Sequence, residues 1–344
     1  MNRTISIDWL SLYCECYVLN DNNFYKFERQ NESSGQFKEI WKVYDKIDKE
    51  LYCVIQRTPW SPIIPKHTTM VKVANRYLYR QDWNTKLMHF LNVCHIIPKS
   101  ISRIDIAADF NHFDNNLKVE SFIQGFLSNK YIKMGQNKYT LMGEQKNQHE
   151  YSYLRFGNRE SEISAYLYNK SKELKEVHDK PYIREMWEEN GINTKKDVWR
   201  LEVSLRNKQM KTIVKQTGEM LRIDLDFLKT QGIVENVFNC AVLKAFDFRI
   251  NDNQKQKRRM KRLELFRGMT STLLMIVPTN EACTNRMDKI VVKKLANCVS
   301  EYRVDNQESY EIIRRAMDEI ITQCGLKDYY YEKVHPQIKF FKDS

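Results

Sequence analysis

Polar side chains fall on one face of three short segments in which apolar and polar residues alternate. The segments span residues 102–110, 163–170 and 199–206. Alternation with a period of two is typical of β-strands that bury one face. If the three strands share a sheet, we expect its polar face to carry Arg103, Asp105, Asp109, Tyr166, Tyr168, Lys170, Arg200 and Glu202.

These residue types suit chemistry at a phosphate group. Neighbouring carboxylates repel each other unless a cation lies between them, and the oxygens of Asp105, Asp109 and Glu202 are hard ligands that suit Mg²⁺ or Mn²⁺. Such an ion polarises a phosphate oxygen. A phenol with a pKa of ~10 needs a nearby cation or base to act as a nucleophile, and this requirement applies to Tyr168. The same alternation is also typical of an ordinary sheet whose solvated face carries surface ion pairs.

The elements around these strands predict a mixed α and β architecture. Alternation predicts further strands at residues 4–9, 37–44, 51–57, 70–79 and 151–156. In the first of them, Ile5, Ile7 and Trp9 alternate with polar residues and are expected on one buried face. Helical spacing predicts helices at residues 83–93 and 117–127.

Beyond about residue 208 the pattern becomes helical. Asp224 can cap a helix that runs towards Phe246, and residues 280–302 and 306–324 have the pattern of amphipathic helices. We therefore predict the α+β class, with an α+β domain over residues 1–208 and a helical domain over residues 209–344.

The charge balance favours an anionic partner. The 344 residues include 56 Lys and Arg against 44 Asp and Glu, a net charge of +12. A basic run lies in the helical half, where six cations stand against Asp252: Lys255, Lys257, Arg258, Arg259, Lys261 and Arg262. We interpret this run as a phosphate-contacting element, with a solvated charged surface as the alternative.

Other classes of protein fit the sequence poorly. No apolar run approaches the ~18 residues of a membrane span, and the N-terminus lacks the apolar core of a signal peptide. The eight cysteines form no C-x-x-C pair and the histidines no H-x-H pair, so a zinc site is not expected. We expect a cytoplasmic protein with no membrane partner.

Short motifs of the first 208 residues occur in the order of a known family. They are the segments Ile7–Leu10, Arg103–Asp109 (R-x-D-x-x-x-D), Gly157–Ser161 (G-x-R-x-S), Tyr168–Lys170 (Y-N-K) and Arg200–Glu202 (R-x-E). Together they resemble the replication-initiation and relaxase family of rolling-circle plasmids and integrative conjugative elements. The resemblance implies an antiparallel-sheet nicking domain of the rolling-circle replication-initiator type, followed here by the helical domain.

The resemblance also implies an activity and roles for residues. The family nicks and rejoins single-stranded DNA at an origin in a metal-dependent reaction that yields a 5′-phosphotyrosine and a free 3′-OH primer. Carried onto this chain, Tyr168 is the nucleophile, and Asp105 and Glu202 hold Mg²⁺ or Mn²⁺ with Asp109 as a third ligand. Lys170 stabilises phosphate charge or favours the phenolate.

Further roles follow from the same resemblance. Arg103, Arg159 and Arg200 are expected to contact phosphates or to orient the carboxylates. Tyr166 stands where the family often has Arg, which makes it a second candidate nucleophile, whereas Asp8 is expected to be a structural hydrogen-bonding residue. The implied partners are origin DNA, single-stranded or in a hairpin, a host helicase and a second copy of the chain, in a bacterial or mobile-element setting.

Two other functions remain open on the sequence. A conjugative relaxase would cut a transfer origin with the same polar face. A non-catalytic, sequence-specific DNA-binding protein or repressor would use the same fold, but it would be expected to lack a ligand or the tyrosine.

Overall fold

The computed structural model describes residues 2–135, 138–145, 149–158, 161–177, 179–217, 221, 223–230, 232–267 and 269–275, with scattered positions between 315 and 331. Contacts divide the chain into two units, Met1–Ile276 and Val277–Ser344. This division differs from the predicted boundary at residue 208, because the segment 207–275 packs with the sheet of the first unit. The helices predicted at 280–302 and 306–324 lie outside the described residues, apart from short helical pieces between 315 and 322.

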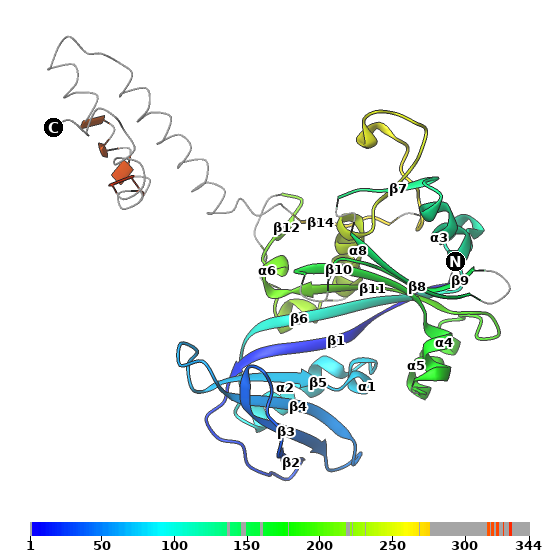
Figure 1. Cartoon of the computed structure of the whole chain (residues 1–344). Helices are drawn as coiled ribbons and strands as arrows, with labels where there is room; N and C mark the ends of the chain where they lie inside the picture. Colours follow the sequence, from blue (N-terminus) through cyan, green and yellow to red (C-terminus); the bar gives the residue numbers. More distant parts are fainter. Residues whose placement is uncertain are drawn as a thin grey trace. The chain divides into compact units, whose positions relative to one another are not determined.

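The first unit is built on one large antiparallel sheet (Figure 1). In spatial order its strands are β2 (Tyr25–Gln30), β3 (Phe37–Asp45), β4 (Leu51–Pro59), β5 (Thr68–Val73), β1 (Thr4–Glu15), β6 (Ile97–Phe110), β11 (Trp199–Arg206), β10 (Ile163–Asn169), β9 (His149–Phe156) and β8 (Tyr139–Gln145). All neighbouring pairs are antiparallel. The predicted α+β class is therefore confirmed.

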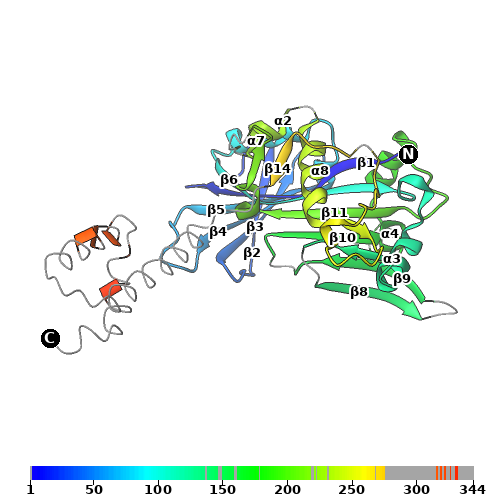
Figure 2. The same cartoon turned by 90° about the horizontal axis from the view of Figure 1, so that it is seen from above.

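Helices cover both faces of this sheet. The apolar face packs against α1 (Asn75–Leu78), α2 (Trp83–Val93), α3 (Val119–Leu127), α7 (Leu225–Leu228) and α8 (Ile233–Ala245). Figure 2 shows α8 lying across β10 and β11. On the opposite side lie α4 (Lys170–Glu176) and α5 (Pro181–Glu189), which form a small separate core (Figure 1).

Short elements complete the first unit. They are α6 (Asn207–Met210), the pair β7 (Tyr131–Lys133) and β13 (Phe248–Ile250), the pair β12 (Ile213–Lys215) and β14 (Leu273–Met275), and the 3₁₀ turns Asp114–Asn116 and Lys257–Arg259. Within the described part of the chain, no helix combines the length and apolar character needed to cross a bilayer.

The register of the strands explains why one face of the large sheet is apolar and buried. Val203 of β11 pairs with Ile106 of β6, which pairs with Ile7 of β1, and all three side chains are buried. Residues that pair directly point to the same face, so successive rows stack into one apolar layer. A one-residue slip would expose that layer, and its burial therefore fixes the register.

A β-bulge in β1 changes the face of one predicted core residue. Ile7 pairs with Ile106, but Trp9 pairs with Asp105, so an extra residue, Asp8, is inserted between them. The bulge moves Trp9 to the polar face, contrary to the predicted alternation. The expectation that Trp9 shares a buried face with Ile7 is therefore wrong.

Other predicted elements match the structure to different degrees. The helix predicted at 83–93 coincides with α2, and the strands at 37–44 and 51–57 coincide with β3 and β4. The strand predicted at 70–79 ends at Val73, where α1 follows. The Asp224 side chain caps α7 by accepting a hydrogen bond from the Phe227 amide (2.9 Å), but Gly232 in the left-handed region separates α7 from α8.

Candidate active site

The register of three central strands brings the predicted polar residues onto one face. Arg200 of β11 lies between Tyr168 of β10 and Asp109 of β6. Two residues further along β11, Glu202 pairs with Tyr166, and Ser204 then pairs with Asp105. The strands thus share a sheet, as the alternation predicted, and this face lies opposite the apolar core.

Tyr168 contacts a carboxylate directly. Its hydroxyl donates a hydrogen bond to Oε2 of Glu202 at 3.0 Å. Burial raises the pKa of Tyr168 well above its usual value, and the nearby Glu202 carboxylate raises it further, so the phenol is neutral at physiological pH. Reaction through this oxygen requires the proton to leave, and Glu202 lies within reach to accept it.

Glu202 differs from the other carboxylates of the face in forming no ion pair with a described residue. Burial raises the pKa of Glu202 to about 8, and repulsion from Asp8 and Asp105 acts in the same direction. The group is thereby poised to exchange a proton near neutral pH, or to bind a cation that removes the repulsion.

Arg200, which pairs with Tyr168 and Asp109 across the strands, is the centre of a buried hydrogen-bond network on the polar face. Its Nε and Nη2 donate to the two oxygens of Asp109 at 2.6 and 2.7 Å, and its Nη1 donates to Oδ1 of Asp8 at 2.5 Å. Trp187 of α5 donates to Asp109 at 2.7 Å, and Tyr79 donates to Asp8 at 2.6 Å. Arg200 and Asp109 are 0% and 1% exposed. Of the two roles left open for Arg200, this geometry favours orienting carboxylates over contacting phosphates.

Arg103 and Asp105 form a second pair further along β6. Nε and Nη2 of Arg103 lie 2.8 and 2.5 Å from the two oxygens of Asp105, and Nε also lies 3.2 Å from the Ser204 hydroxyl. The guanidinium covers the ring of Trp9, 5.4 Å from its centroid, which is the contact that the bulge in β1 makes possible. Burial raises the pKa of Asp105, and Arg103 opposes that rise.

Lys170 approaches the candidate nucleophile from a helix rather than from the strand. The Asn169 side chain accepts a hydrogen bond from the Lys172 amide (2.9 Å) and caps α4, so β10 ends one residue before Lys170. The Lys170 ammonium lies 5.6 Å from the centroid of the Tyr168 ring and pairs with Glu173. Burial lowers the pKa of Lys170, and Arg200 lowers it further.

The second candidate tyrosine has different partners. The Tyr166 hydroxyl accepts a hydrogen bond from Ser164 at 3.1 Å. The Tyr153 ring lies 6.4 Å from the rings of both Tyr166 and Tyr168. Of the two candidates, Tyr168 is the one hydrogen-bonded to a carboxylate.

The G-x-R-x-S motif forms the turn between β9 and β10. Gly157 has φ +88°, and a Cβ there would lie 3.1 Å from the Ile163 carbonyl oxygen and from Ser164. The Ser161 hydroxyl accepts from the Asn158 amide at 2.8 Å. Glycine is therefore required by both conformation and space. Arg159 of this motif lies outside the described residues.

Only part of the predicted ligand set suits a metal ion. Both oxygens of Asp109 are taken by Arg200, and those of Asp105 are paired with Arg103. Across the described ranges, no group of three or more His, Cys, Asp or Glu side chains has the arrangement of a metal site. Mg²⁺, however, is commonly held by one or two carboxylates together with substrate phosphates, and Glu202 is the predicted ligand that forms no ion pair with a described residue.

The predicted basic run occupies an exposed loop after β13. Its ends are tied by hydrogen bonds from the Ile250 amide to the Lys261 carbonyl and from the Asn251 amide to the Lys130 carbonyl, both 2.9 Å. Arg262 pairs with Asp247 at 2.9 Å. In the described part of the chain, the remaining cations have no acidic partner: Lys255, Lys257, Arg258, Arg259 and Lys261. The run is thus separate from the tyrosine and its carboxylates.

Sequence reasoning missed the residues that reach the network from outside the three strands. Trp187 and Tyr79 lie on or beside helices that no motif singled out, and Trp187 is 78 positions from Asp109. The apolar spacing of Ile183 and Trp187 at i and i+4, after Pro181, was the available signal for α5.

Comparisons with known proteins give a structural similarity and no sequence match. No family model matches the chain, and no curated protein matches it. Among solved structures, the chain is similar to a rolling-circle replication initiator protein from Geobacillus stearothermophilus, at 12% sequence identity and a TM-score of 0.44. The alignment covers 76% of this chain and 93% of that chain.

Proposed function

We propose that this chain is a rolling-circle replication initiator that nicks and rejoins one strand of origin DNA through Tyr168. The observation that carries the proposal is the hydrogen bond between the Tyr168 hydroxyl and Glu202, a half-buried carboxylate with no ion pair in the described part of the chain. Other tyrosines also donate to carboxylates, as Tyr79 does to Asp8, but Asp8 is ion-paired with Arg200. A nucleophilic phenol must lose its proton to a neighbouring base, and Glu202 is the carboxylate that can accept it.

The residues have separate roles in the proposed reaction. Glu202 takes the phenol proton as the Tyr168 oxygen attacks the scissile phosphorus. A phosphorus–oxygen bond to tyrosine forms, and the bond from phosphorus to the 3′-oxygen breaks. The departing 3′-oxygen takes up a proton and becomes the primer end. Lys170, beside the Tyr168 ring, offsets negative charge on the phenolate and the phosphate.

A divalent ion fits this proposal. Glu202 would hold Mg²⁺ or Mn²⁺, with Asp105 as a second ligand once the ion displaces Arg103 from one of its oxygens. The ion would supply charge neutralisation at the phosphate oxygens. Arg200 would act as a positioning residue, since it fixes Asp8 and Asp109 without being exposed to a substrate. Asp109, enclosed by Arg200 and Trp187, would support the site rather than bind the ion.

The decisive experiment follows covalent capture of DNA. The protein is incubated with Mn²⁺ and a supercoiled replicon that encodes it, and the products are separated on a denaturing gel. We expect relaxed plasmid and a protein–DNA adduct from the wild type. Tyr168→Phe should give no adduct, and Glu202→Gln should slow its formation by a factor on the order of 10²–10⁴, the usual contribution of a proton acceptor.

Tyr166→Phe is the matched control, because it removes a hydroxyl from the same strand and face. An adduct that persists in Tyr168→Phe and disappears in Tyr166→Phe would move the nucleophile to Tyr166. Origin binding by the wild type with neither relaxation nor adduct would favour the non-catalytic DNA-binding alternative.

A further inference from the structure

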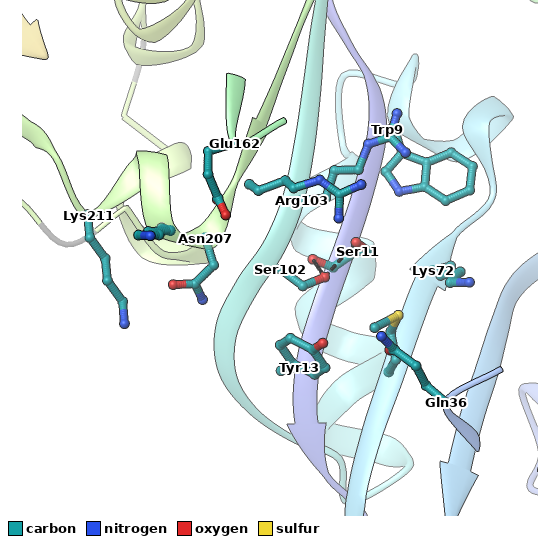
Figure 3. Close-up of a pocket in the computed structure, with 13 residues that line it drawn as sticks. Trp9, Ser11, Tyr13, Gln36, Lys72, Ser102, Arg103, Glu162, Asn207 and Lys211 are labelled. Atoms are coloured by element: carbon teal, nitrogen blue, oxygen red, sulfur yellow. Dashed lines mark hydrogen bonds between the residues drawn. The ribbon is translucent and has the colours of Figure 1, made fainter. Parts of the chain in front are cut away.

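A cavity of about 450 Å³ opens on the polar face of the sheet beyond the Arg103–Asp105 pair (Figure 3). It lies between β11 and α6 on one side and β5 on the other. Five cations line it against a single carboxylate, Glu162. They are Lys72, Arg103, Arg206, Lys208 and Lys211. A concave surface with this charge balance attracts anions.

The cations are placed by strand register rather than by flexible surface loops alone. Arg206 of β11 pairs with Arg103 of β6, Arg103 with Ser11 of β1, and Ser11 with Lys72 of β5. One row across four neighbouring strands therefore carries three cations and a hydroxyl on the same face. α6 adds Lys208, and Lys211 follows at its C-terminal end.

Repulsion between neighbouring cations of this row would be relieved by a bound anion. Directly opposed like charges destabilise a sheet, and here the row approaches Lys72 closely enough for burial and Arg103 to lower its pKa. Arg103 directs Nε and Nη2 to Asp105, and its Nη1 makes no hydrogen bond to a described residue. Lys72, Lys208 and Lys211 have no acidic partner in the described part of the chain.

The cavity also offers rings and hydroxyls. Trp9 and Tyr13 belong to its lining, and the hydroxyls of Ser11 and Ser102 lie 2.6 Å apart at its floor. Figure 3 shows Lys211 and Lys72 on opposite sides of this floor, with Arg103 reaching towards Trp9. Aromatic rings and a row of cations together are the features that bind single-stranded DNA, because its unpaired bases stack on the rings while the cations neutralise its phosphates.

We propose that this cavity binds the phosphates and bases of a single DNA strand that continues from the scissile phosphate. The proposal rests on the proposed function for its substrate. Arg206 lies four positions after Glu202 along β11, about 13 Å of strand, so the cavity would hold nucleotides near the break without touching it. Arg103, shared by the Asp105 pair and the cavity, joins the two sites.

The test measures binding without cleavage. The probe is a fluorescent oligothymidylate of about 20 nucleotides, followed by anisotropy between about 50 and 200 mM NaCl. Lys208→Ala/Lys211→Ala should weaken binding about tenfold and reduce the slope of log K against log salt by about 1.4, since each single-strand phosphate contact contributes about 0.7. Lys118→Ala/Lys244→Ala is the charge-matched control on the opposite side of the sheet and should match the wild type.

A single substitution on the other side of the cavity provides a further test. Lys72→Ala by itself should weaken binding of the oligothymidylate. The Lys208→Ala/Lys211→Ala change should reduce affinity for a duplex of equal length less than it reduces affinity for the single strand. An equal loss for both would overturn the assignment to single strands. Displacement of the probe by millimolar pyrophosphate at constant ionic strength would show a site for free anions and would also overturn it.

The outcome is separable from that of the nicking proposal. Tyr168→Phe should bind the oligothymidylate like the wild type, because it leaves the cavity intact. Unchanged affinity and salt slope in Lys208→Ala/Lys211→Ala would overturn the cavity proposal alone. A tenfold loss in that variant, combined with a wild type that forms no covalent adduct, would instead overturn the proposed cleavage.

Discussion

At the scale of single residues, Asp8, Asp105, Asp109 and Glu202 of the polar face are in two electrostatic states. Asp8 and Asp109 share Arg200, and Asp105 pairs with Arg103, whereas Glu202 has the Tyr168 hydroxyl as its hydrogen-bond partner among the described side chains. Burying a charge is costly unless it is paired. Glu202 has no such pair, so the cost of burying its charge is not offset beside the candidate nucleophile.

Arg200→Met should destabilise the protein strongly. The change leaves Asp109 buried at 1% exposure with only Trp187 as a donor from its present side-chain partners. Removing one partner of a buried ion pair typically costs about 3–5 kcal/mol. The free energy of unfolding in urea measures the effect. Arg200→Met/Asp109→Asn, which removes the stranded charge, should recover part of the loss, and no recovery would contradict the pairing argument.

Lys133 should make stability depend on pH. Burial lowers the pKa of Lys133 to about 8, from a usual 10.5, although Asp247 opposes the shift. The folded state therefore releases its proton at lower pH than the unfolded state does. The unfolded chain binds more protons between these two pH values, so stability rises across that interval. The gain is up to about 3 kcal/mol.

The measurement is urea unfolding at several pH values from neutral to alkaline. Lys133→Met keeps the packing against Phe156 but removes the titrating group. The difference in unfolding free energy between variant and wild type should shrink as the pH rises from about 8 to 10.5. A difference that stays constant would show that Lys133 is solvated in the folded protein.

At the scale of elements, the turn between β9 and β10 depends on a glycine. Gly157→Ala places a side chain at φ +88° and 3.1 Å from backbone and side-chain atoms. We expect a loss of about 1–3 kcal/mol of unfolding free energy. Gly35→Ala is the control, because a Cβ there has no atom within 4 Å. Equal melting temperatures for the two variants would contradict the strain argument.

Element prediction succeeded where periodicity was local and failed where tertiary contacts intervened. The helix α2 has three apolar residues on one face and no competing signal, so its limits are predicted from the sequence. The bulge at Asp8 is not, because alternation of Ile7 and Trp9 fits an unbroken strand equally well. The role of Asp109 depends on Arg200 and Trp187, 91 and 78 positions away, and no local pattern encodes those distances.

At the scale of the whole molecule, the net charge of +12 has identifiable locations. One is the cavity between β11 and β5, and another is the exposed loop after β13. The carboxylates of the polar face lie apart from that loop, and Asp8, Asp105 and Asp109 are paired with Arg103 or Arg200. The excess positive charge is therefore available at the surface to attract a polyanion.

The loop after β13 should contribute to DNA affinity through its charge. Replacing four exposed cations with serine should weaken DNA binding and reduce the salt slope by up to about 3.6 for a duplex, since each phosphate contact contributes about 0.9. The four are Lys255, Lys257, Arg258 and Arg259. Stability should not change, because their side chains are exposed and form no ion pair with a described residue. Anisotropy with origin DNA at several salt concentrations tests this, and a wild-type slope in the variant would make the loop ordinary solvated surface.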